Sequence, residues 1–268
     1  AFINLAVCIA SCVFFEYILR RMMKRPQTIS DMSAVVTGML LGMNLPPTIN
    51  PLYGVIGSFV AIGIAKQLFG GIGQNFANPA IVGRIVLMLS FTASMSTWCK
   101  PFYYLNGADV VTGATPLVSK DADYLSLLLG TTGGCIGETC AIALIAGGIY
   151  LIAARIITPH APVAFIGTVF LLTLIAGDDP IYAVLSGGLI IGAFFMATDY
   201  ATTPLTGKGK IIFGIGCGLI TFAIRKFGNY PEGVSFSILL MNLLVPYIDR
   251  LCETKPVGAK APEKEASK

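Results

Sequence analysis

Long apolar segments separated by short polar loops dominate the sequence and constrain the fold more than any other feature. A helix that crosses a membrane needs about 20 apolar residues, and nine segments come close to that length: 1–19, 33–45, 52–69, 79–95, 134–154, 162–176, 180–197, 211–226 and 233–250. Only 12% of the 268 residues are charged, whereas ordinary soluble domains carry about 25%. So few charges cannot cover a water-facing surface, which excludes a soluble enzyme, a nucleic-acid-binding protein and a disordered chain. We therefore predict an all-α polytopic membrane protein, a bundle of about nine transmembrane helices.

Some of these helices are expected to be short or broken. The segment 33–45 ends at a Pro-Pro pair, and 124–130 is too short to span, so we predict that it forms a helix at the membrane interface. Residues 1–250 are interpreted as one transmembrane domain and 251–268 as a basic, flexible cytoplasmic tail. Because Ala1 already lies inside an apolar segment, we expect further residues before it.

The basic residues predict how the bundle is oriented. Loops on the cytoplasmic side of a membrane are enriched in Lys and Arg, and four basic residues between 20 and 25 follow the first segment. Alternation from that point places loop 70–78 inside, loop 96–123 outside and the tail inside. Further basic residues that this topology places inside are Arg155, Lys208 and Lys210, whereas Arg225 and Lys226 fall outside.

Glycine is concentrated in clusters such as Gly70-Gly71-Ile72-Gly73, Gly133-Gly134 and Gly187-Gly188. Glycines inside spans let helices approach closely, and irregular backbone persists at membrane depth only where it is buried in protein or lines a cavity. Two interpretations follow, a bundle that encloses a cavity or tight helix packing alone.

A weak internal repeat occurs at an offset of 129 residues. Pro51, Tyr53, Val55, Ile62 and Gly63 recur as Pro180, Tyr182, Val184, Ile191 and Gly192. The matches indicate either an internal duplication, as in many transporters, or only the shared composition of membrane segments.

The most informative polar stretch is loop 96–123, which contains Asp109-Val110-Val111-Thr112-Gly113-Ala114-Thr115. A bare T-G-A-T is typical of an ordinary turn. The longer D-x-x-T-G-A-T pattern, with five defined positions, resembles the sequence that bacterial FMN transferases recognise. The resemblance implies covalent FMN, attached through its phosphate to Thr115, with Asp109, Thr112, Gly113 and Ala114 as the recognition sequence.

Four further blocks resemble the D-subunit family of the Rnf complexes, the ion-translocating ferredoxin:NAD⁺ oxidoreductases. A more distant likeness is to the B subunit of the sodium-translocating NADH:quinone reductase. The blocks, in the family's order, are Ser33 to Pro47, Gly70 to Asn75 with Asn78-Pro79-Ala80, Met196 to Asp199 with Thr202-Thr203-Pro204, and Tyr230 to Val234. The family carries a soluble stretch and another span before the position of Ala1, so the resemblance implies about ten spans in the full-length protein. Phe76-Ala77 departs from the pair that relatives often carry before Asn78.

This resemblance implies a flavoprotein subunit of a redox-driven translocase in the bacterial cell membrane. Such a subunit carries covalent FMN and relays electrons between ferredoxin and NAD⁺ with coupled Na⁺ or H⁺ transport. A second, non-covalent flavin, riboflavin or FMN, is also implied. The implied partners are the other Rnf subunits, an FMN transferase for maturation and the lipid bilayer. The chain has no G-x-G-x-x-G dinucleotide motif, so we expect it to act only inside its complex.

Several charged and polar side chains are candidates for the chemistry. Arg84 lies inside an apolar segment, where a charge is costly and marks a functional candidate; it could pair with a carboxylate, contact a flavin, or extend to the interface. Lys66 is expected to extend to the inner surface. Asp199 and Glu232 lie in family blocks and are candidates for ion coupling, and Asp199 and Asn78 for flavin contact.

The seven cysteines include no C-x-x-C pair, so we interpret them as packing residues and expect no metal site. No residue is assigned a catalytic role. A different class of function, a polytopic solute channel or secondary transporter without flavin, is suggested by the interrupted helices alone. A covalent flavin distinguishes the two classes.

Overall fold

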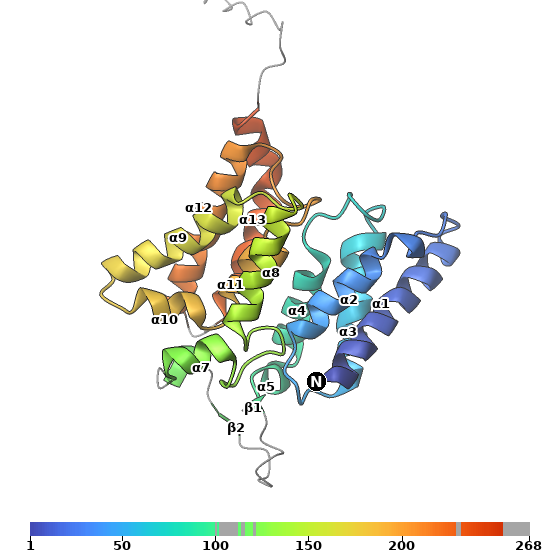
Figure 1. The fold of residues 1–268 in the computed structure, drawn as a ribbon. Helices are drawn as coiled ribbons and strands as arrows, with labels where there is room; N and C mark the ends of the chain where they lie inside the picture. The colour runs from blue at the N-terminus through green and yellow to red at the C-terminus, as the bar shows by residue number, and fades with distance from the viewer. Residues whose placement is uncertain (100, 102–111, 114–115, 120–121, 229–231, 254–268) are drawn as a thin grey trace, which may run out of the picture.

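The computed structural model describes residues 1–99, 101, 112–113, 116–119, 122–228 and 232–253, and in these the chain is mostly helical (Figure 1). The N-terminal part contains α1 (Phe2–Met22), the 3-10 helix η1 (Ile29–Asp31), α2 (Ser33–Met43), α3 (Pro51–Phe59), the π-helix η2 (Val60–Gln67), α4 (Pro79–Ser90) and α5 (Thr92–Met95). Two short strands follow, β1 (Trp98–Cys99) and β2 (Thr112–Gly113), which pair antiparallel.

The C-terminal part begins with two short helices, α6 (Pro116–Ser119) and α7 (Tyr124–Leu129). It continues with α8 (Ala141–Ala153), α9 (His160–Ile175), α10 (Pro180–Leu185), α11 (Leu189–Ile191), the π-helix η4 (Gly192–Met196), α12 (Gly207–Phe227) and α13 (Gly233–Leu251). Figure 1 shows α1, α2 and α3 on one side of the molecule and α9, α10 and α12 on the other. The strands and α7 lie at one end, and the C-terminal end of α13 lies at the opposite end.

Helix α1 buries its polar residues and exposes its apolar ones. Its buried residues, spaced by four, form a single stripe: Asn4, Cys8, Cys12, Glu16 and Arg20. The Asn4 amide donates to the carbonyl of Ile49 at 2.9 Å, while Phe2 and Phe14 on other faces are exposed. A helix of a soluble protein shows the reverse pattern. The arrangement fits surroundings of hydrocarbon, where polar groups find partners only inside the protein.

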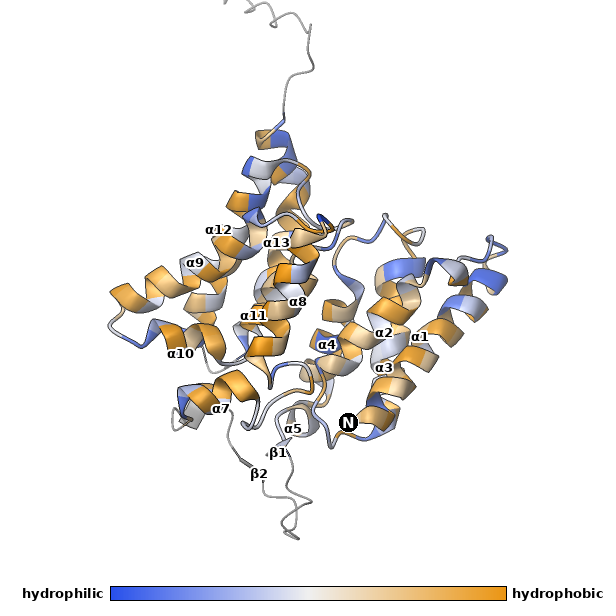
Figure 2. Cartoon of the chain, viewed as in Figure 1, coloured by the Kyte–Doolittle hydropathy of each residue, from blue (hydrophilic) through white to orange (hydrophobic). Residues whose placement is uncertain are grey.

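Apolar side chains also cover the outer surface of the second half. Figure 2 shows strongly apolar α8, α9 and α10, and the large exposed side chains there include Ile142, Tyr150, Leu171 and Ile181. Helices α1, α12 and α13 are each long and apolar enough to cross a membrane. These features, together with the helical content, agree with a helical membrane protein.

Each of the nine predicted segments contains helix, but nine transmembrane helices are not confirmed among the described residues. In 134–154 the helix starts only at Ala141, because the stretch before it pairs with other backbone. There the N–H of Gly137 donates to Met43 at 2.7 Å and that of Ile136 donates to Leu45 at 3.2 Å. The segment 124–130 forms the short helix α7, as predicted.

The predicted segment 180–197 is interrupted as well. Helix α10 ends before Ser186, and α11 starts only after Gly188. Gly187 has φ +67°, a conformation that L side chains rarely adopt. We call Ser186–Gly188 the break, and it reappears in both sites described below.

Three helices begin with the same local sequence, an Asn or Asp followed by Pro. Helices α3, α4 and α10 start after Asn50, Asn78 and Asp179, whose side-chain oxygens accept hydrogen bonds from backbone N–H groups of the first turn. The Pro that follows has no N–H to leave unpaired and its φ is already helical. The Asn-Pro or Asp-Pro pair therefore determines where each of these three helices starts.

The internal repeat falls on equivalent elements. Pro51 and Pro180 begin α3 and α10, and Gly63 and Gly192 lie in the π-helices η2 and η4. Both repeats therefore combine a capped helix with a π-helical stretch, a geometry that is rare and is found mostly at functional sites.

Close contact between α1 and α2 depends on glycine. A Cβ at Gly38 would lie 2.7 Å from Ile9 Cα and 2.8 Å from Cys8 O, whereas a Cβ at Gly167 in α9 meets nothing within 4 Å. We expect Gly38→Ala to lower the thermal unfolding midpoint of the detergent-solubilised protein, because overpacking costs about 1–3 kcal/mol. Gly167→Ala is the matched control and should be neutral or stabilising, since Ala is the better helix former by about 1 kcal/mol. Equal midpoints for the two variants would contradict the packing described for α1 and α2.

Candidate functional site

The structure describes two residues of the D-x-x-T-G-A-T motif, and these form β2. The strand is held by its antiparallel pairing with β1. Asp109, Ala114 and Thr115 lie outside the described residues, so the roles assigned to them stay predictions, as do those of Thr112 and Gly113.

The chain directly after the motif is anchored to α10. The carbonyl of Pro116 accepts a 2.8 Å hydrogen bond from the Tyr182 hydroxyl. Leu117 packs against the break, where a Cβ at Gly187 would lie 2.6 Å from Leu117 Cδ1.

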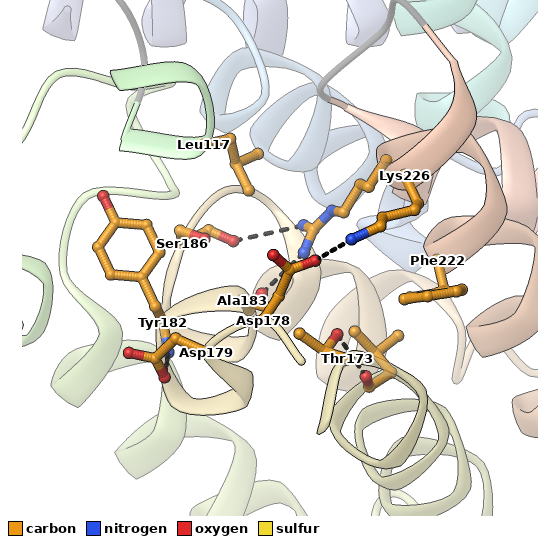
Figure 3. Close-up of a pocket in the computed structure, with 11 residues that line it drawn as sticks. Leu117, Thr173, Asp178, Asp179, Tyr182, Ala183, Ser186, Phe222 and Lys226 are labelled. Atoms are coloured by element: carbon orange, nitrogen blue, oxygen red, sulfur yellow. Dashed lines mark hydrogen bonds and ion pairs between the residues drawn. The ribbon is translucent and has the colours of Figure 1, made fainter. Parts of the chain in front are cut away.

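A cavity of about 320 Å³ opens next to Leu117, between α9, α10 and α12 (Figure 3). Its walls include the apolar side chains of Val169, Ala183 and Phe222. Arg225 of α12 forms part of the polar side: its guanidinium donates to the carbonyl of Ala183 at 2.7 Å and to that of Ser186 at 3.3 Å. These carbonyls belong to the end of α10 and to the break, so Arg225 stabilises the interruption.

Acidic residues flank the mouth of this cavity. Asp178 pairs with Lys226 at 2.5 Å, with both side chains partly exposed. Asp179 caps α10 and also accepts from the Tyr124 hydroxyl. The Tyr124 hydroxyl and the backbone N–H groups of α10 hold the pKa of Asp179 below its usual value.

A second site, the Arg84 cluster, lies in the interior. Arg84 in α4 is 2% exposed and forms ion pairs with Glu232, the residue before α13, and with Glu138 at 3.2 Å. Nη1 of Arg84 donates to Asn44 Oδ1 at 2.6 Å, and Nη2 lies 3.5 Å from Cys135 Sγ. A buried charge needs this kind of pairing because water is absent.

Irregular backbone builds the Arg84 cluster. Asn44 ends α2, and Cys135 and Glu138 belong to the non-helical stretch that pairs with the end of α2. The break touches the cluster too, since a Cβ at Gly188 would lie 2.7 Å from Glu138 Oε1. Such backbone at depth is stable only inside protein, and here it surrounds buried ion pairs.

The cluster decides between two of the alternatives for Arg84, and its contact with a flavin stays a prediction. Arg84 pairs with carboxylates and does not extend to the interface. Glu232, a predicted ion-coupling residue, is one partner; Glu138 was missed, although an acidic residue inside an apolar segment satisfies the same criterion that singled out Arg84. Cys135, Glu138 and Glu232 converge within 4.8 Å of one another, and the guanidinium of Arg84 already provides a cation to all three.

The prediction that Lys66 extends to the inner surface was wrong. Lys66 is 2% exposed and binds Glu16 of α1 at 2.6 Å and Ser33 of α2 at 2.6 Å. Its ammonium is therefore neutralised within the protein and does not extend toward water.

Hydrogen bonds lead from the Arg84 cluster toward α11 and η4. Asn44, which accepts from Arg84, donates to the sulfur of Met196 at 3.5 Å. Asn78, the cap of α4, donates to the carbonyl of the same Met196 at 3.2 Å.

The chain of contacts continues to Asp199. Asn242 of α13, with its amide turned so that both groups find partners, accepts from the Asn78 N–H at 3.1 Å and donates to Thr202 O at 3.0 Å. The Thr202 hydroxyl donates to Asp199 at 3.0 Å. We call this series, from Arg84 through Asn44, Met196, Asn78, Asn242 and Thr202 to Asp199, the polar path. It joins three of the predicted site residues, Arg84, Asn78 and Asp199, across the bundle.

We expect Arg84→Met to destabilise the protein strongly, because removing one partner from a buried ion pair costs about 3–5 kcal/mol. Lys226→Met is the comparison: its pair with Asp178 is partly exposed and contributes about 0–1 kcal/mol. Thermal unfolding in detergent measures both, and Arg84→Met combined with Glu138→Gln and Glu232→Gln should recover part of the loss. Equal unfolding midpoints for Arg84→Met and Lys226→Met would contradict the buried pairing.

Comparison of the sequence with known proteins shows the family to which the chain is similar. The NQR2, RnfD, RnfE family model matches residues 1–258. The chain is 46% identical to the D subunit of the Na⁺-translocating ferredoxin:NAD⁺ oxidoreductase complex of Acetobacterium woodii, over 97% of this chain and 84% of the relative. It is also 46% identical to the D subunit of the proton-translocating complex of Clostridium ljungdahlii, over 94% and 82% of the two chains.

A third relative, the D subunit of the ion-translocating oxidoreductase complex of Stutzerimonas stutzeri, is 38% identical over 95% of this chain and 82% of its own length. The matches extend through every element from α1 to α13, and so include the cavity, the Arg84 cluster and the polar path. The chain belongs to the NQR2, RnfD, RnfE family.

Proposed function

We propose that this chain is the D subunit of an ion-translocating ferredoxin:NAD⁺ oxidoreductase complex and that it carries FMN covalently on Thr115. The observation that carries the proposal is the complete D-x-x-T-G-A-T sequence within a chain that matches D-subunit relatives over nearly all its length. The chain acts as part of a redox-driven translocase, together with the other subunits of that complex.

The residues around the motif fit a covalently held flavin. Described residues lie on both sides of the attachment residue in sequence: β2, inside the motif, pairs with β1, and Pro116, directly after the motif, accepts a hydrogen bond from Tyr182. The cavity beside Leu117 is large enough for a flavin ring system and has a polar side at the half-buried Arg225. When bound, FMN supplies the electron transfer; the chain's own residues would hold it and exclude water.

The polar path supports a role in ion coupling. It connects Glu232, through Arg84, to Asp199 by side chains and backbone groups that are mostly buried. Ionisable residues inside a membrane protein are costly and mark ion pathways. The two 46% identical relatives are named for different ions, Na⁺ and H⁺. The proposal therefore covers transport of either ion, and an ion-flux assay distinguishes the two.

The proposed topology follows the charges. Loop 96–123, with the motif, lies on the extracytoplasmic side of the bacterial membrane, and the C-terminal tail lies in the cytoplasm. Maturation requires an FMN transferase that acts on Thr115 on that side of the membrane. A second, non-covalent flavin is part of the proposal as a further cofactor of the bundle.

We expect the full-length chain, co-expressed with an FMN transferase, to give a fluorescent band under ultraviolet light on a denaturing gel. Thr115→Ala should abolish the fluorescence, because it removes the hydroxyl that forms the phosphodiester. Thr131→Ala, an exposed threonine outside the motif, is the control and should leave the band unchanged.

A dark parental band, with the transferase active on another substrate, would contradict covalent FMN. It would favour the alternative, a solute channel or secondary transporter without flavin. Fluorescence that persists in Thr115→Ala would contradict the attachment residue only.

We expect Asp199→Asn and Glu232→Gln to retain FMN and to lose most of the ion transport that the complex couples to electron transfer. Ion uptake by proteoliposomes during ferredoxin oxidation measures this, with Na⁺ and pH indicators read in parallel. Asp123→Asn, an exposed carboxylate outside the helices, is the charge-matched control. Unchanged flavin content and unchanged pumping in both variants would remove these residues from the coupling.

A further inference from the structure

Two buried polar groups at the cavity between α9, α10 and α12 have no hydrogen-bond partner among the described residues. They are Nε of Arg225 and Oγ of Ser186. Ser186 is 1% exposed, and both residues line the cavity. A buried donor without a partner costs about 1–3 kcal/mol, so a group of this kind inside an apolar pocket indicates a ligand that supplies the missing acceptor.

We propose, on the basis of the flavin attachment proposed above, that this cavity holds the isoalloxazine ring of the FMN carried on Thr115, with Arg225 and Ser186 at its polar edge. The two residues are positioning residues for the ring. Neither is in the attachment motif or in the Arg84 cluster.

The cavity lies within reach of the attachment point. Thr115 is bonded to Pro116, so their Cα atoms are about 3.8 Å apart. The carbonyl of Pro116 is fixed by Tyr182, which itself lines the cavity, and Leu117 forms part of the wall. The chain that directly follows the attachment residue therefore lies at the cavity.

The shape and chemistry of the cavity suit a flat aromatic ring with one polar edge. Its volume of about 320 Å³ is at the lower end for small-molecule sites, and Val169, Ala183 and Phe222 give it apolar walls. The pyrimidine edge of isoalloxazine offers acceptors at N1 and the C2 carbonyl and a donor at N3. The Arg225 guanidinium and the Ser186 hydroxyl are the complementary groups, and a positive charge near N1 tunes flavin electronics.

The charges at the mouth disfavour a phosphate head group as the occupant. The nearest ammonium, that of Lys226, is already paired with Asp178 at 2.5 Å. Asp179 adds a second carboxylate to the lining. With Asp178 and Lys226 paired, Arg225 and Asp179 leave the lining without net charge, which suits an uncharged ring system with acceptors along one edge better than an anionic head group.

Iodide quenching of flavin fluorescence tests the proposal. The full-length chain, loaded by the transferase and solubilised in detergent, should show strong protection of its FMN. Arg225→Met should shift the ratio of enclosed to free flavin by about tenfold to a hundredfold, the factor for one hydrogen bond to a charged group. Quenching then approaches that of free FMN, and the reduction potential becomes more negative. Arg155→Met is the matched control, because Arg155 is exposed and follows the C-terminal end of α8. It should change neither the quenching nor the reduction potential.

Two further variants separate binding from structural damage, since Arg225 also stabilises the break. Ala183→Leu narrows the cavity and should expose the flavin. Ser186→Ala removes an unpartnered hydroxyl, so the flavin-free protein should be equally stable or more stable, while protection in the loaded protein falls about two- to tenfold.

The outcomes are distinguishable. Covalent fluorescence on a denaturing gel, with equal quenching in the parent and all three variants, overturns this inference and leaves the flavin attachment intact. Equal quenching together with a loss of co-purified phosphatidylglycerol in Arg225→Met, which lipid mass spectrometry measures, identifies the cavity as a lipid site. A dark parental gel band contradicts the attachment and this inference together.

Discussion

The structure depends on one constraint: in hydrocarbon, each buried polar group must find its partner inside the protein. Arg84 shows the consequence most clearly, because a single guanidinium joins α4 to Asn44 at the end of α2, to Glu138 in a non-helical stretch and to Glu232 before α13. Three segments far apart in sequence are thus held by one charge. The same requirement accounts for the polar stripe on α1 and for the burial of Lys66 against Glu16.

The lengths of the apolar segments predicted the helical class and the approximate positions of the helices, because apolar length is a local property. The interruptions were not predictable in this way. Whether 134–140 continues as a helix depends on the carbonyls of Met43 and Leu45, which capture its N–H groups, and no local pattern reports such partners. Glycine clusters at 133–134 and 187–188 did indicate irregular backbone, and the structure has irregular backbone at both places.

The candidate residues were predicted one at a time, but their association was not. Arg84 and Glu232 are 148 positions apart, and only the fold brings them together. Asp199 lies apart from that pair and is connected to it through Asn78 and Asn242. Asn78 was singled out as a flavin contact, whereas in the structure its side chain caps α4 and binds the Met196 carbonyl. Local sequence identified polar residues that are costly to bury, and tertiary structure determined what each one touches.

The break Ser186–Gly188 also acts as a thin partition between two charged compartments. On one side, a Cβ at Gly187 would approach Arg225 Nη2 to 3.2 Å; on the other, a Cβ at Gly188 would approach Glu138 Oε1 to 2.7 Å. Adjacent Cα atoms are only about 3.8 Å apart, and electrostatic fields are weakly screened in such surroundings. A change of charge in the Arg225 cavity is therefore transmitted to the buried carboxylates as a change of potential, without any helix having to move.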